Sequence, residues 1–438
     1  MSYAEQYIAK KCSPKEAVSM ICNDDVVFMG GEPSALLEAL YLNRKEYSGL
    51  KLYSAFGLSG VQADNINSED LAGHIGYTTT VLKRREERAW MRGNVDQVLV
   101  HFSELEDLIE QRYRPTVLLT HCSPPDAEGW LNMHGQAGCG CGRSVINCGA
   151  RVIVEVNEAI PTITTDYYRI HISEVSALCE SNAPPAAADV VKQEPSKVDE
   201  LIAAHVVERI PDGATIQLGA GSAPAMVGHF LENHKDLGIH TELFGQTLAR
   251  LMKKGAVNNS KKTVMPGLSV AAFLGGGKET HDFANKNPAV MFKQLSWVNN
   301  PAIISQIDNM TSINSCLGVD LRGQVCSESI GFTNTGGLGG QLDFIRGTRA
   351  SKGGKSFIVM RSMLEKKDGT KVSKITLNLP EGSVVSTPRS DVMYIATEYG
   401  IADLHQKSHK ERARALIEVA HPEFRDLLTY QAKKHCFI

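Results

Sequence analysis

Long apolar stretches are missing from this sequence. Its apolar runs, such as Leu268 to Leu274 and Val152 to Val156, fall far short of the ~20 residues that a membrane-spanning helix needs. Residues 1–5 contain no apolar signal segment either. We therefore expect a cytoplasmic protein without a membrane partner.

An excess of either charge is also missing. The 46 Lys and Arg residues nearly balance the 49 Asp and Glu residues, and the net charge of -3 argues against a nucleic-acid partner. Hydrophobic residues make up 42% and charged residues 22% of the chain, which is typical of a soluble globular enzyme. A chain of 438 residues is too long for one ordinary domain and indicates two, of roughly 200 residues each.

A regular cysteine framework is absent. The ten cysteines are scattered, which in a large cytosolic chain favours reduced, buried thiols over disulfides. The tightest group, Cys139 and Cys141 with Cys148, His121 and His134 nearby, resembles a zinc site only loosely, because no paired C-x-x-C motif frames it. We therefore expect no metal.

A change in composition marks the domain boundary. Proline, alanine and charged residues replace the apolar periodicity at residues 181–189 and 192–196. We predict an N-terminal α/β domain over residues 1–181, a linker over 182–196 and a C-terminal α/β domain over 197–438.

The two halves echo each other at a constant offset of 188 residues. The matching features are Asp24 with Asp212, Gly31 with Gly219, and Phe56-Gly57 with Phe244-Gly245. A constant offset is typical of an internal duplication. The same offset places Ser54 where the second half has Glu242, so only the C-terminal half carries a carboxylate there.

Each copy contains an acidic turn, a short apolar strand (residues 26–29 and 215–218), a glycine turn, a helix and a second strand. This succession predicts parallel-sheet units with right-handed crossovers. The predicted fold is α/β, with two similar open parallel-sheet domains. Such sheets bind ligands at the carboxyl ends of their strands, so we expect the site there.

The first glycine turn is Gly219-Ala220-Gly221-Ser222-Ala223. One interpretation is a tight turn that starts a helix. The other is a cradle in which Ser222 caps the helix and free backbone N–H groups face a phosphate or thioester oxygen. The turn lacks the third glycine of the dinucleotide fingerprint, which argues against NAD.

A second glycine-dense segment runs from Thr335 to Phe344, with four glycines in five residues. Each glycine costs conformational entropy when it is ordered. The segment is therefore either a mobile surface loop or a set of backbone amides that point at a developing oxyanion.

Glu242 follows the second strand of the C-terminal half. A glutamate at a strand end is often a cap or half of an ion pair. Beside a phosphate-sized cradle, the same carboxylate could attack an acyl thioester, form a mixed anhydride and then store the thiol as a glutamyl thioester. A second carboxylic acid would reverse these steps, with water excluded.

These segments together resemble the family I CoA-transferases, in the acetyl-CoA hydrolase/transferase branch that includes 4-hydroxybutyrate and butyrate:acetate enzymes. The resemblance spans nearly the whole chain. The segments that carry it are Gly30 to Pro33, Gly93 to Asp96, His101 to Glu104, Ser123 to Trp130, Glu155 to Asn157, Gly219 to Ala223, His240 to Glu242, Ser312 to Ser315, Val319 to Val325, Gly336 to Phe344 and Ala396 to Leu404.

The resemblance implies a role for each candidate. Glu242 is the glutamate that forms the glutamyl-CoA thioester, and the turn of Gly219, Ala220, Gly221, Ser222 and Ala223 is part of the CoA cradle. Asn314, Gly337 and Gly340 line the same pocket, and Gly31 faces it from the N-terminal half. We place the oxyanion donors on the backbone amides of Gly339 and Gly340.

The family fold consists of two similar α/β halves with the site between them. The resemblance also implies coenzyme A as a substrate, no permanently bound cofactor, and a homo-oligomer. Two departures from the family pattern are Gly318, where we expect a larger polar residue, and Cys139-Gly140-Cys141 in a segment of small residues.

The acyl group stays open. The branch suggests butyryl-, 4-hydroxybutyryl- or acetyl-CoA. The basic run Lys83 to Arg88 is either a solvated face or a source of one arginine for the pocket, which would favour a dicarboxylate such as succinate or itaconate. The alternatives are an acyl-CoA hydrolase on the same scaffold and a non-catalytic relative that binds CoA or a sugar phosphate.

Overall fold

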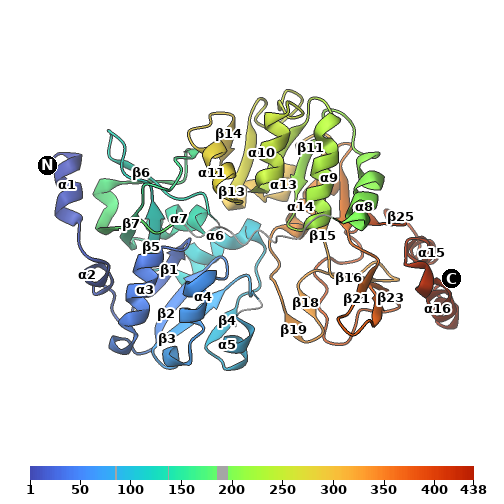
Figure 1. Cartoon of the computed structure of the whole chain (residues 1–438), viewed down its shortest axis with the longest axis horizontal. Helices are drawn as coiled ribbons and strands as arrows, with labels where there is room; N and C mark the ends of the chain where they lie inside the picture. Colours follow the sequence, from blue (N-terminus) through green and yellow to red (C-terminus); the bar gives the residue numbers. More distant parts are fainter. Residues whose placement is uncertain (84–85, 137, 185–195) are drawn as a thin grey trace. The chain divides into compact units, whose positions relative to one another are not determined.

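The computed structural model describes residues 1–438 except 84–85, 137 and 185–195. The chain folds into two compact units (Figure 1). Unit 1 comprises Met1–Val190, Leu243–Gln246 and Val270–Val298, and unit 2 comprises Val191–Glu242, Thr247–Ser269 and Asn299–Ile438. Most of the linker expected over 182–196 lies outside the described residues.

Unit 1 is built on a seven-stranded sheet in the order β10-β7-β5-β1-β2-β3-β4, in which every adjacent pair is parallel. All six residues of the central strand β5 are buried, as expected for a parallel sheet that is covered on both faces. The strands are β1 (Val26–Gly30), β2 (Leu50–Ser54), β3 (Ile75–Thr79), β4 (Val95–Gln97), β5 (Val117–Cys122), β7 (Arg151–Val156) and β10 (Val175–Glu180).

Helix α3 packs its leucines into the core beneath this sheet. Leu36, Leu37 and Leu40 are fully buried against Met29 of β1 and Leu52 of β2, because residues spaced three and four apart share one face of a helix. The helices of unit 1 are α1 (Tyr3–Lys10), α2 (Pro14–Val18), α3 (Ser34–Leu42), α4 (Gly60–Ile66), α5 (Glu87–Met91), α6 (Leu105–Asp107), α7 (Gly142–Asn147), α11 (Lys278–Ala284) and α12 (Leu295–Val298). Its other strands are β6 (Trp130–Asn132), β8 (Thr164–Thr165), β9 (Arg169–His171), β13 (Ser269–Leu274, in unit 1 from Val270) and β14 (Val290–Phe292).

Unit 2 has a main sheet in the order β25-β24-β20-β15-β11-β12. Its adjacent pairs are parallel except β24 with β25, which is antiparallel. The strands are β11 (Thr215–Leu218), β12 (Gly238–Phe244), β15 (Met310–Ser315), β20 (Lys355–Val359), β24 (Tyr394–Thr397) and β25 (Gly400–Asp403). The helices are α8 (Lys197–Val207), α9 (Ser222–Phe230), α10 (Gln246–Lys253), α13 (Pro301–Ile304), α14 (Gln341–Ala350), α15 (His409–Glu418) and α16 (Pro422–Lys434).

Smaller sheets of unit 2 pair β16 with β17 and β23, β18 with β19, and β21 with β22. These strands are β16 (Gly318–Asp320), β17 (Val325–Cys326), β18 (Ser329–Ile330), β19 (Thr333–Asn334), β21 (Met363–Glu365), β22 (Lys371–Ser373) and β23 (Ile375–Thr376). The sequence pattern predicts neither these sheets nor the antiparallel edge strand β25.

The duplication is visible in the structure. Helix α3 begins at Ser34 and ends at Leu42, while α9 begins at Ser222 and ends at Phe230, which is a shift of 188 residues at both ends. The strand orders β7-β5-β1-β2 and β20-β15-β11-β12 correspond. Two similar parallel α/β units are therefore confirmed.

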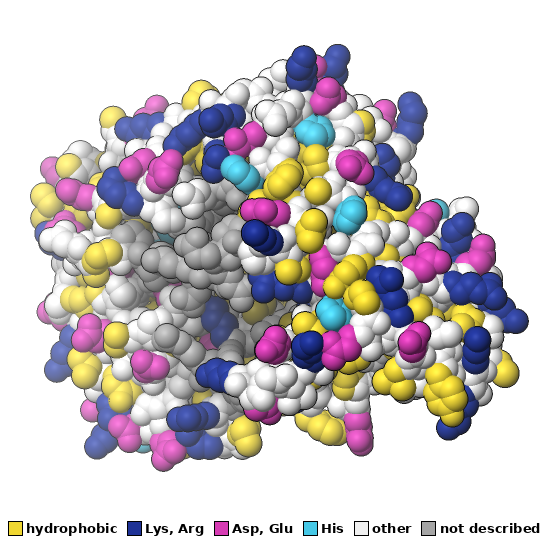
Figure 2. All heavy atoms as spheres, turned by 45° about the vertical axis from the view of Figure 1, so that its right-hand side comes forward, with side chains coloured by type: hydrophobic (Ala, Val, Ile, Leu, Met, Phe, Trp, Pro, Cys, Tyr) yellow, Lys and Arg dark blue, Asp and Glu magenta, His cyan; other side chains and the backbone are white. Residues whose placement is uncertain are grey.

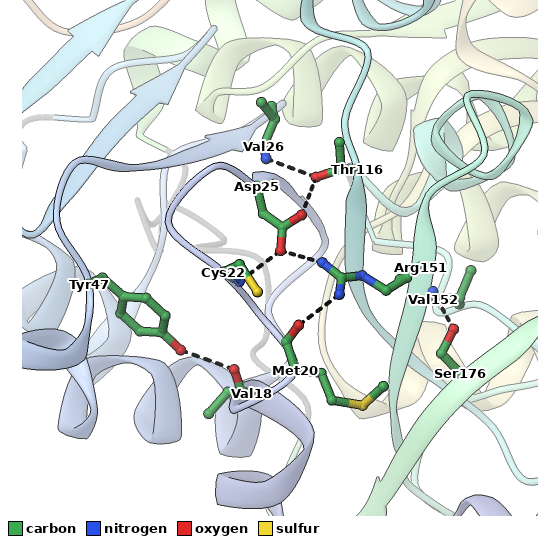
Figure 3. Close-up of polar contacts among 10 residues, drawn as sticks. All are labelled: Val18, Met20, Cys22, Asp25, Val26, Tyr47, Thr116, Arg151, Val152 and Ser176. Carbon is green, nitrogen blue, oxygen red and sulfur yellow. Dashed lines mark hydrogen bonds and ion pairs between the residues drawn. The ribbon is translucent and has the colours of Figure 1, made fainter.

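Asp25 anchors the start of β1 (Figure 3). Its carboxylate accepts hydrogen bonds from the Thr116 hydroxyl at 2.7 Å and the Cys22 N–H at 2.8 Å, and it pairs with the Arg151 guanidinium. Burial alone would raise the pKa of Asp25, but these three donors outweigh it and the pKa lies below its ordinary value. The acidic residue with this role is thus Asp25, whereas its neighbour Asp24 is exposed.

The surface carries charges of both signs. On the face drawn in Figure 2, Lys and Arg side chains alternate with Asp and Glu side chains. No helix within the described residues has the length and apolar character needed to cross a membrane. All ten cysteines are free thiols, and six of them are buried, which agrees with the expectation of reduced cysteines.

Candidate active site

The glycine turn after β11 is shaped by a neighbouring asparagine. Gly219 donates its N–H to the Ile313 carbonyl at 2.8 Å, and a Cβ on Gly219 would lie 2.4 Å from Asn314 Oδ1, so a larger residue does not fit there. The Ala220 carbonyl accepts a hydrogen bond from the Ser315 hydroxyl at 2.9 Å. The turn is therefore fixed against the carboxyl end of β15.

Helix α9 begins differently from the sequence prediction. Its N-cap is Gly221, at φ 128°, and not Ser222, which is the first residue of the helix. Such a φ is open to glycine but strained for serine, so the backbone at Gly221 decides where the helix starts. Ala223 is buried in the first turn.

Gln217 is a site residue that the sequence pattern did not reveal. Its side-chain amide and that of Asn314 exchange two hydrogen bonds, of 2.9 and 3.0 Å, and both residues are buried. This pair joins β11 to β15 directly below the Gly219 turn. A glutamine inside the short buried strand β11 was the available signal.

Three candidates lie at the same level on adjacent strands. Ile216 of β11 is opposite Ile239 of β12 and Thr311 of β15. Three residues further along are Gly219, directly after β11, Asn314 in β15, and Glu242. Glu242 lies inside β12, contrary to the sequence prediction that it follows the strand. The parallel register thus brings these candidates together at the carboxyl ends of the strands, where parallel sheets bind ligands.

Glu242 is held by two donors. Asn299 Nδ2 donates to Glu242 Oε2 at 2.7 Å, and the backbone N–H of Gly340 also donates to the carboxylate. Gly340 is the N-cap of the ten-residue helix α14, so the carboxylate lies at the positive end of that helix. Asn299 belongs to none of the sequence motifs that predicted the site.

Gly340 has no room for a side chain. A Cβ there would lie 1.9 Å from Asn299 Nδ2 and 2.0 Å from Glu242 Oε2. Gly337 and Gly339 are partly buried in the same loop, and Gly339 has a left-handed φ of 55°. The segment before α14 is therefore partly buried in unit 2, and Gly340 at its end is buried.

The environment of Glu242 favours its protonated form. Burial and, less strongly, the nearby Asp343 carboxylate raise the pKa of this carboxyl to about 7, against the opposing effect of the Asn299 and Gly340 donors. Carboxyl and carboxylate forms are thus comparably populated near neutral pH. Titratable groups with this property are concentrated at functional sites.

Gly31 belongs to unit 1, at the end of β1. Its φ is 86°, and a Cβ would lie 2.6 Å from His121 Nε2 and 2.7 Å from Cys139 Sγ. Burial lowers the pKa of His121 to about 4, so its ring is neutral.

Among the residues that the structure describes, no cluster of three or more His, Cys, Asp or Glu side chains could hold a metal ion.

Ser54, the counterpart of Glu242 in unit 1, makes local hydrogen bonds. The Ser54 hydroxyl is 2.8 Å from the Tyr77 hydroxyl and also donates to the Phe56 carbonyl.

In the basic run, Lys83 Nζ donates to the Leu58 carbonyl at 3.2 Å, while Arg84 and Arg85 lie outside the described residues.

The chain is similar to known proteins over its whole length. Residues 1–203 match the acetyl-CoA hydrolase/transferase N-terminal domain, and residues 276–432 match its C-terminal domain. The chain is 38% identical to a 4-hydroxybutyrate coenzyme A transferase of Clostridium kluyveri, over 99% of this chain and 100% of the relative. It is 36% identical to a succinyl-CoA:cyclohexane-1-carboxylate CoA transferase of Geobacter metallireducens, over 99% and 97% of the two chains. The crystal structure of RipA from Yersinia pestis superposes with a TM-score of 0.93 at 34% identity, covering all of both chains.

Proposed function

Because the chain belongs to the acetyl-CoA hydrolase/transferase family, we propose that Glu242 is the nucleophile of its reaction. The protein is a CoA-transferase, which moves CoA between an acyl-CoA and a carboxylic acid. The observation that carries the assignment of Glu242 is its position at the carboxyl ends of the parallel strands, in hydrogen-bond contact with Asn299 and Gly340.

The reaction proceeds in two halves. A Glu242 oxygen attacks the acyl carbon, the C–S bond breaks, and CoA leaves as a thiolate. The thiolate then attacks Cδ of the resulting anhydride, the first acid leaves as a carboxylate, and a glutamyl-CoA thioester remains. The acceptor acid reverses these steps and leaves as the new acyl-CoA.

The pKa of Glu242 suits this role. A carboxyl with a pKa of about 7 is a stronger nucleophile when ionised than an ordinary carboxylate, and enough of it is ionised near neutral pH. The Gly340 amide donates to the charge on the glutamyl oxygen, and Gly339 remains a second candidate donor.

Coenzyme A is the substrate that the Gly219 turn would hold. Backbone N–H groups at the start of α9 suit an anionic or carbonyl oxygen, and Gly219 and Gly221 let that ligand approach the backbone closely. Gly219, Ala220, Gly221, Ser222 and Ala223 form the proposed cradle, with Asn314 and Gly337 of unit 2 as further contacts. The role of Gly31, in unit 1, stays a prediction from the sequence. We assign no permanently bound cofactor.

The proposed acyl groups are butyryl, 4-hydroxybutyryl and acetyl. The relative named for 4-hydroxybutyrate supports this group of short acyl chains. The relative named for succinyl-CoA supports a dicarboxylate as the second candidate. We also propose that the protein is cytoplasmic and forms a homo-oligomer. Within each chain we propose a domain boundary at residues 182–196. Ten free thiols support a reducing compartment.

Acyl-CoA consumption with and without acetate separates transfer from hydrolysis. Transfer predicts loss of acyl-CoA that depends on the acceptor, with ping-pong kinetics. A rate that is the same without acetate would favour the hydrolase. A panel of acceptors (acetate, butyrate, 4-hydroxybutyrate, succinate and itaconate) then identifies the acid.

A further inference from the structure

Gln217 and Asn314 form a closed pair of amides beneath the Gly219 turn of unit 2. Gln217 Nε2 donates to Asn314 Oδ1 at 2.9 Å, and Asn314 Nδ2 donates to Gln217 Oε1 at 3.0 Å. Each amide thus gives one N–H and one lone pair to the other. A flip of either amide would bring oxygen against oxygen and N–H against N–H, so the pair fixes the direction of the Asn314 oxygen.

The parallel register explains why these two side chains meet. Gln217 of β11 is opposite Ser312 of β15, and both point to the same face of the sheet. Asn314 lies two residues beyond Ser312 and shares that face, so the long Gln217 side chain reaches it diagonally. Gln217 is 4% and Asn314 is 7% exposed, so water competes little for these hydrogen bonds.

The Asn314 oxygen lies directly against Gly219. A Cβ on Gly219 would be 2.4 Å from Asn314 Oδ1 and 3.3 Å from Asn314 Cγ. The Gly219 N–H also donates to the carbonyl of Ile313, the residue before Asn314. The glycine turn therefore rests on the Asn314 amide, and a rotation of that amide would displace the turn or leave a gap beside it. Gln217 acts on the turn through Asn314.

Unit 1 builds the same strand, glycine turn and helix without such a pair. The offset of 188 residues places the fully buried Met29 where unit 2 has Gln217. The strand register places His121 where unit 2 has Asn314. A thioether donates no hydrogen bond, so these two side chains cannot form the closed pair. The fold therefore does not require the amide pair, which belongs to the half that carries the proposed nucleophile.

We propose that Gln217 is a positioning residue for CoA, which holds Asn314 against Gly219 and so keeps the glycine turn in the shape that binds the CoA moiety. This inference rests on the proposed function, in which this turn holds CoA. Among the described residues, no hydrogen bond joins either amide to Glu242. Loss of the pair should therefore weaken the binding of acyl-CoA equally in the ground state and in the transition state, which raises KM and leaves kcat unchanged.

The experiment measures kcat and both KM values for CoA transfer from butyryl-CoA to acetate. Gln217→Met introduces the residue that unit 1 has at the equivalent position, and Gln217→Asn keeps an amide that is one methylene too short to reach both atoms of the Asn314 amide. Asn314→Ala and the double variant Gln217→Met/Asn314→Ala complete a double-mutant cycle. Ser312→Ala is the matched control, because Ser312 shares the face of Asn314 and its hydroxyl has no hydrogen-bond partner within the described part of the chain.

We expect KM for butyryl-CoA to rise about tenfold in both Gln217 variants, with kcat and KM for acetate changed less than about 3-fold. Ser312→Ala should keep the wild-type KM. In the Asn314→Ala background, Gln217→Met should raise KM no further, because its effect is transmitted through Asn314. A purely structural role would lower the unfolding temperature and the fraction of active enzyme, which reduces kcat and leaves both KM values as they are.

Three results overturn the inference. The first is a wild-type KM for butyryl-CoA in folded Gln217→Met or Gln217→Asn protein. The second is a further rise in KM when Gln217→Met is added to Asn314→Ala. The third is failure of both Gln217 variants to fold, because the fold would then require the pair. A wild-type protein that transfers no CoA would instead refute the proposed function.

Discussion

Replacing Gly340 by alanine tests how closely the catalytic groups must fit. Gly340 has φ -102° and ψ 9°, values that alanine also adopts, so the substitution strains no backbone angle. The added Cβ would lie 1.9 Å from Asn299 Nδ2 and 2.0 Å from Glu242 Oε2. Ordinary contacts between such atoms are about 3.5 Å, so the carboxylate, the amide or the loop must move by more than about 1 Å.

A displacement of that size costs about 100-fold in rate when it misplaces a reacting group. We therefore expect kcat for CoA exchange between butyryl-CoA and acetate to fall at least about 100-fold in Gly340→Ala. Gly336→Ala is the matched control in the same segment, because its nearest atoms, of Glu328, would be 3.6 Å from the new Cβ. Equal activity of the two variants, with both folded, would refute the geometric reasoning.

Three further predictions concern pH and stability. The pKa of Glu242, about 7, predicts that kcat/KM for acyl-CoA falls about tenfold per pH unit below 7. Because the unfolded carboxyl titrates near 4.5, the wild type should also lose stability relative to Glu242→Gln as pH rises from 4.5 through 7. An equal pH dependence of the free energy of unfolding in the two proteins would contradict this. Gly219→Ala should lower the free energy of unfolding by about 1–3 kcal/mol by disrupting the Gln217–Asn314 pair, whereas Gly245→Ala, with open space around its Cβ, should not. Asp25→Ala should cost about 2–4 kcal/mol by removing the ion-pair partner of Arg151 and the acceptor of the Thr116 hydroxyl, against little loss in Asp24→Ala. Because the pKa of Asp25 is lowered in the folded protein, this difference is present above the ordinary carboxyl range and should shrink as pH falls through the folded pKa.

The sequence predicted the architecture because the duplication left the same local pattern twice. Helices α3 and α9 both follow a buried strand and a glycine turn, and hydrophobic spacing specifies each of them locally. The antiparallel edge β24–β25 could not be foreseen in this way. Its pairing depends on which strands meet in space, and the spacing of apolar residues along the chain does not encode that.

The residues missed at the site share one property. Asn299 acts on a glutamate 57 residues away, and Gln217 acts on an asparagine 97 residues away. Asn299 stands in no local pattern that sets it apart from an ordinary polar residue, and the position of Gln217 in a short buried strand does not indicate its partner. The error at Ser222 has a different origin, since a serine before a helix is usually its cap, but the φ of 128° moves that role to Gly221.

The central claim is that Glu242 carries CoA covalently. Incubation with butyryl-CoA alone, followed by intact-protein mass spectrometry and peptide mapping, tests it directly. We predict a mass increase equal to CoA less one water, located on the peptide that contains Glu242, removed by hydroxylamine and missing in Glu242→Gln. An adduct that persists in Glu242→Gln, or wild-type CoA exchange without any adduct, would contradict the claim.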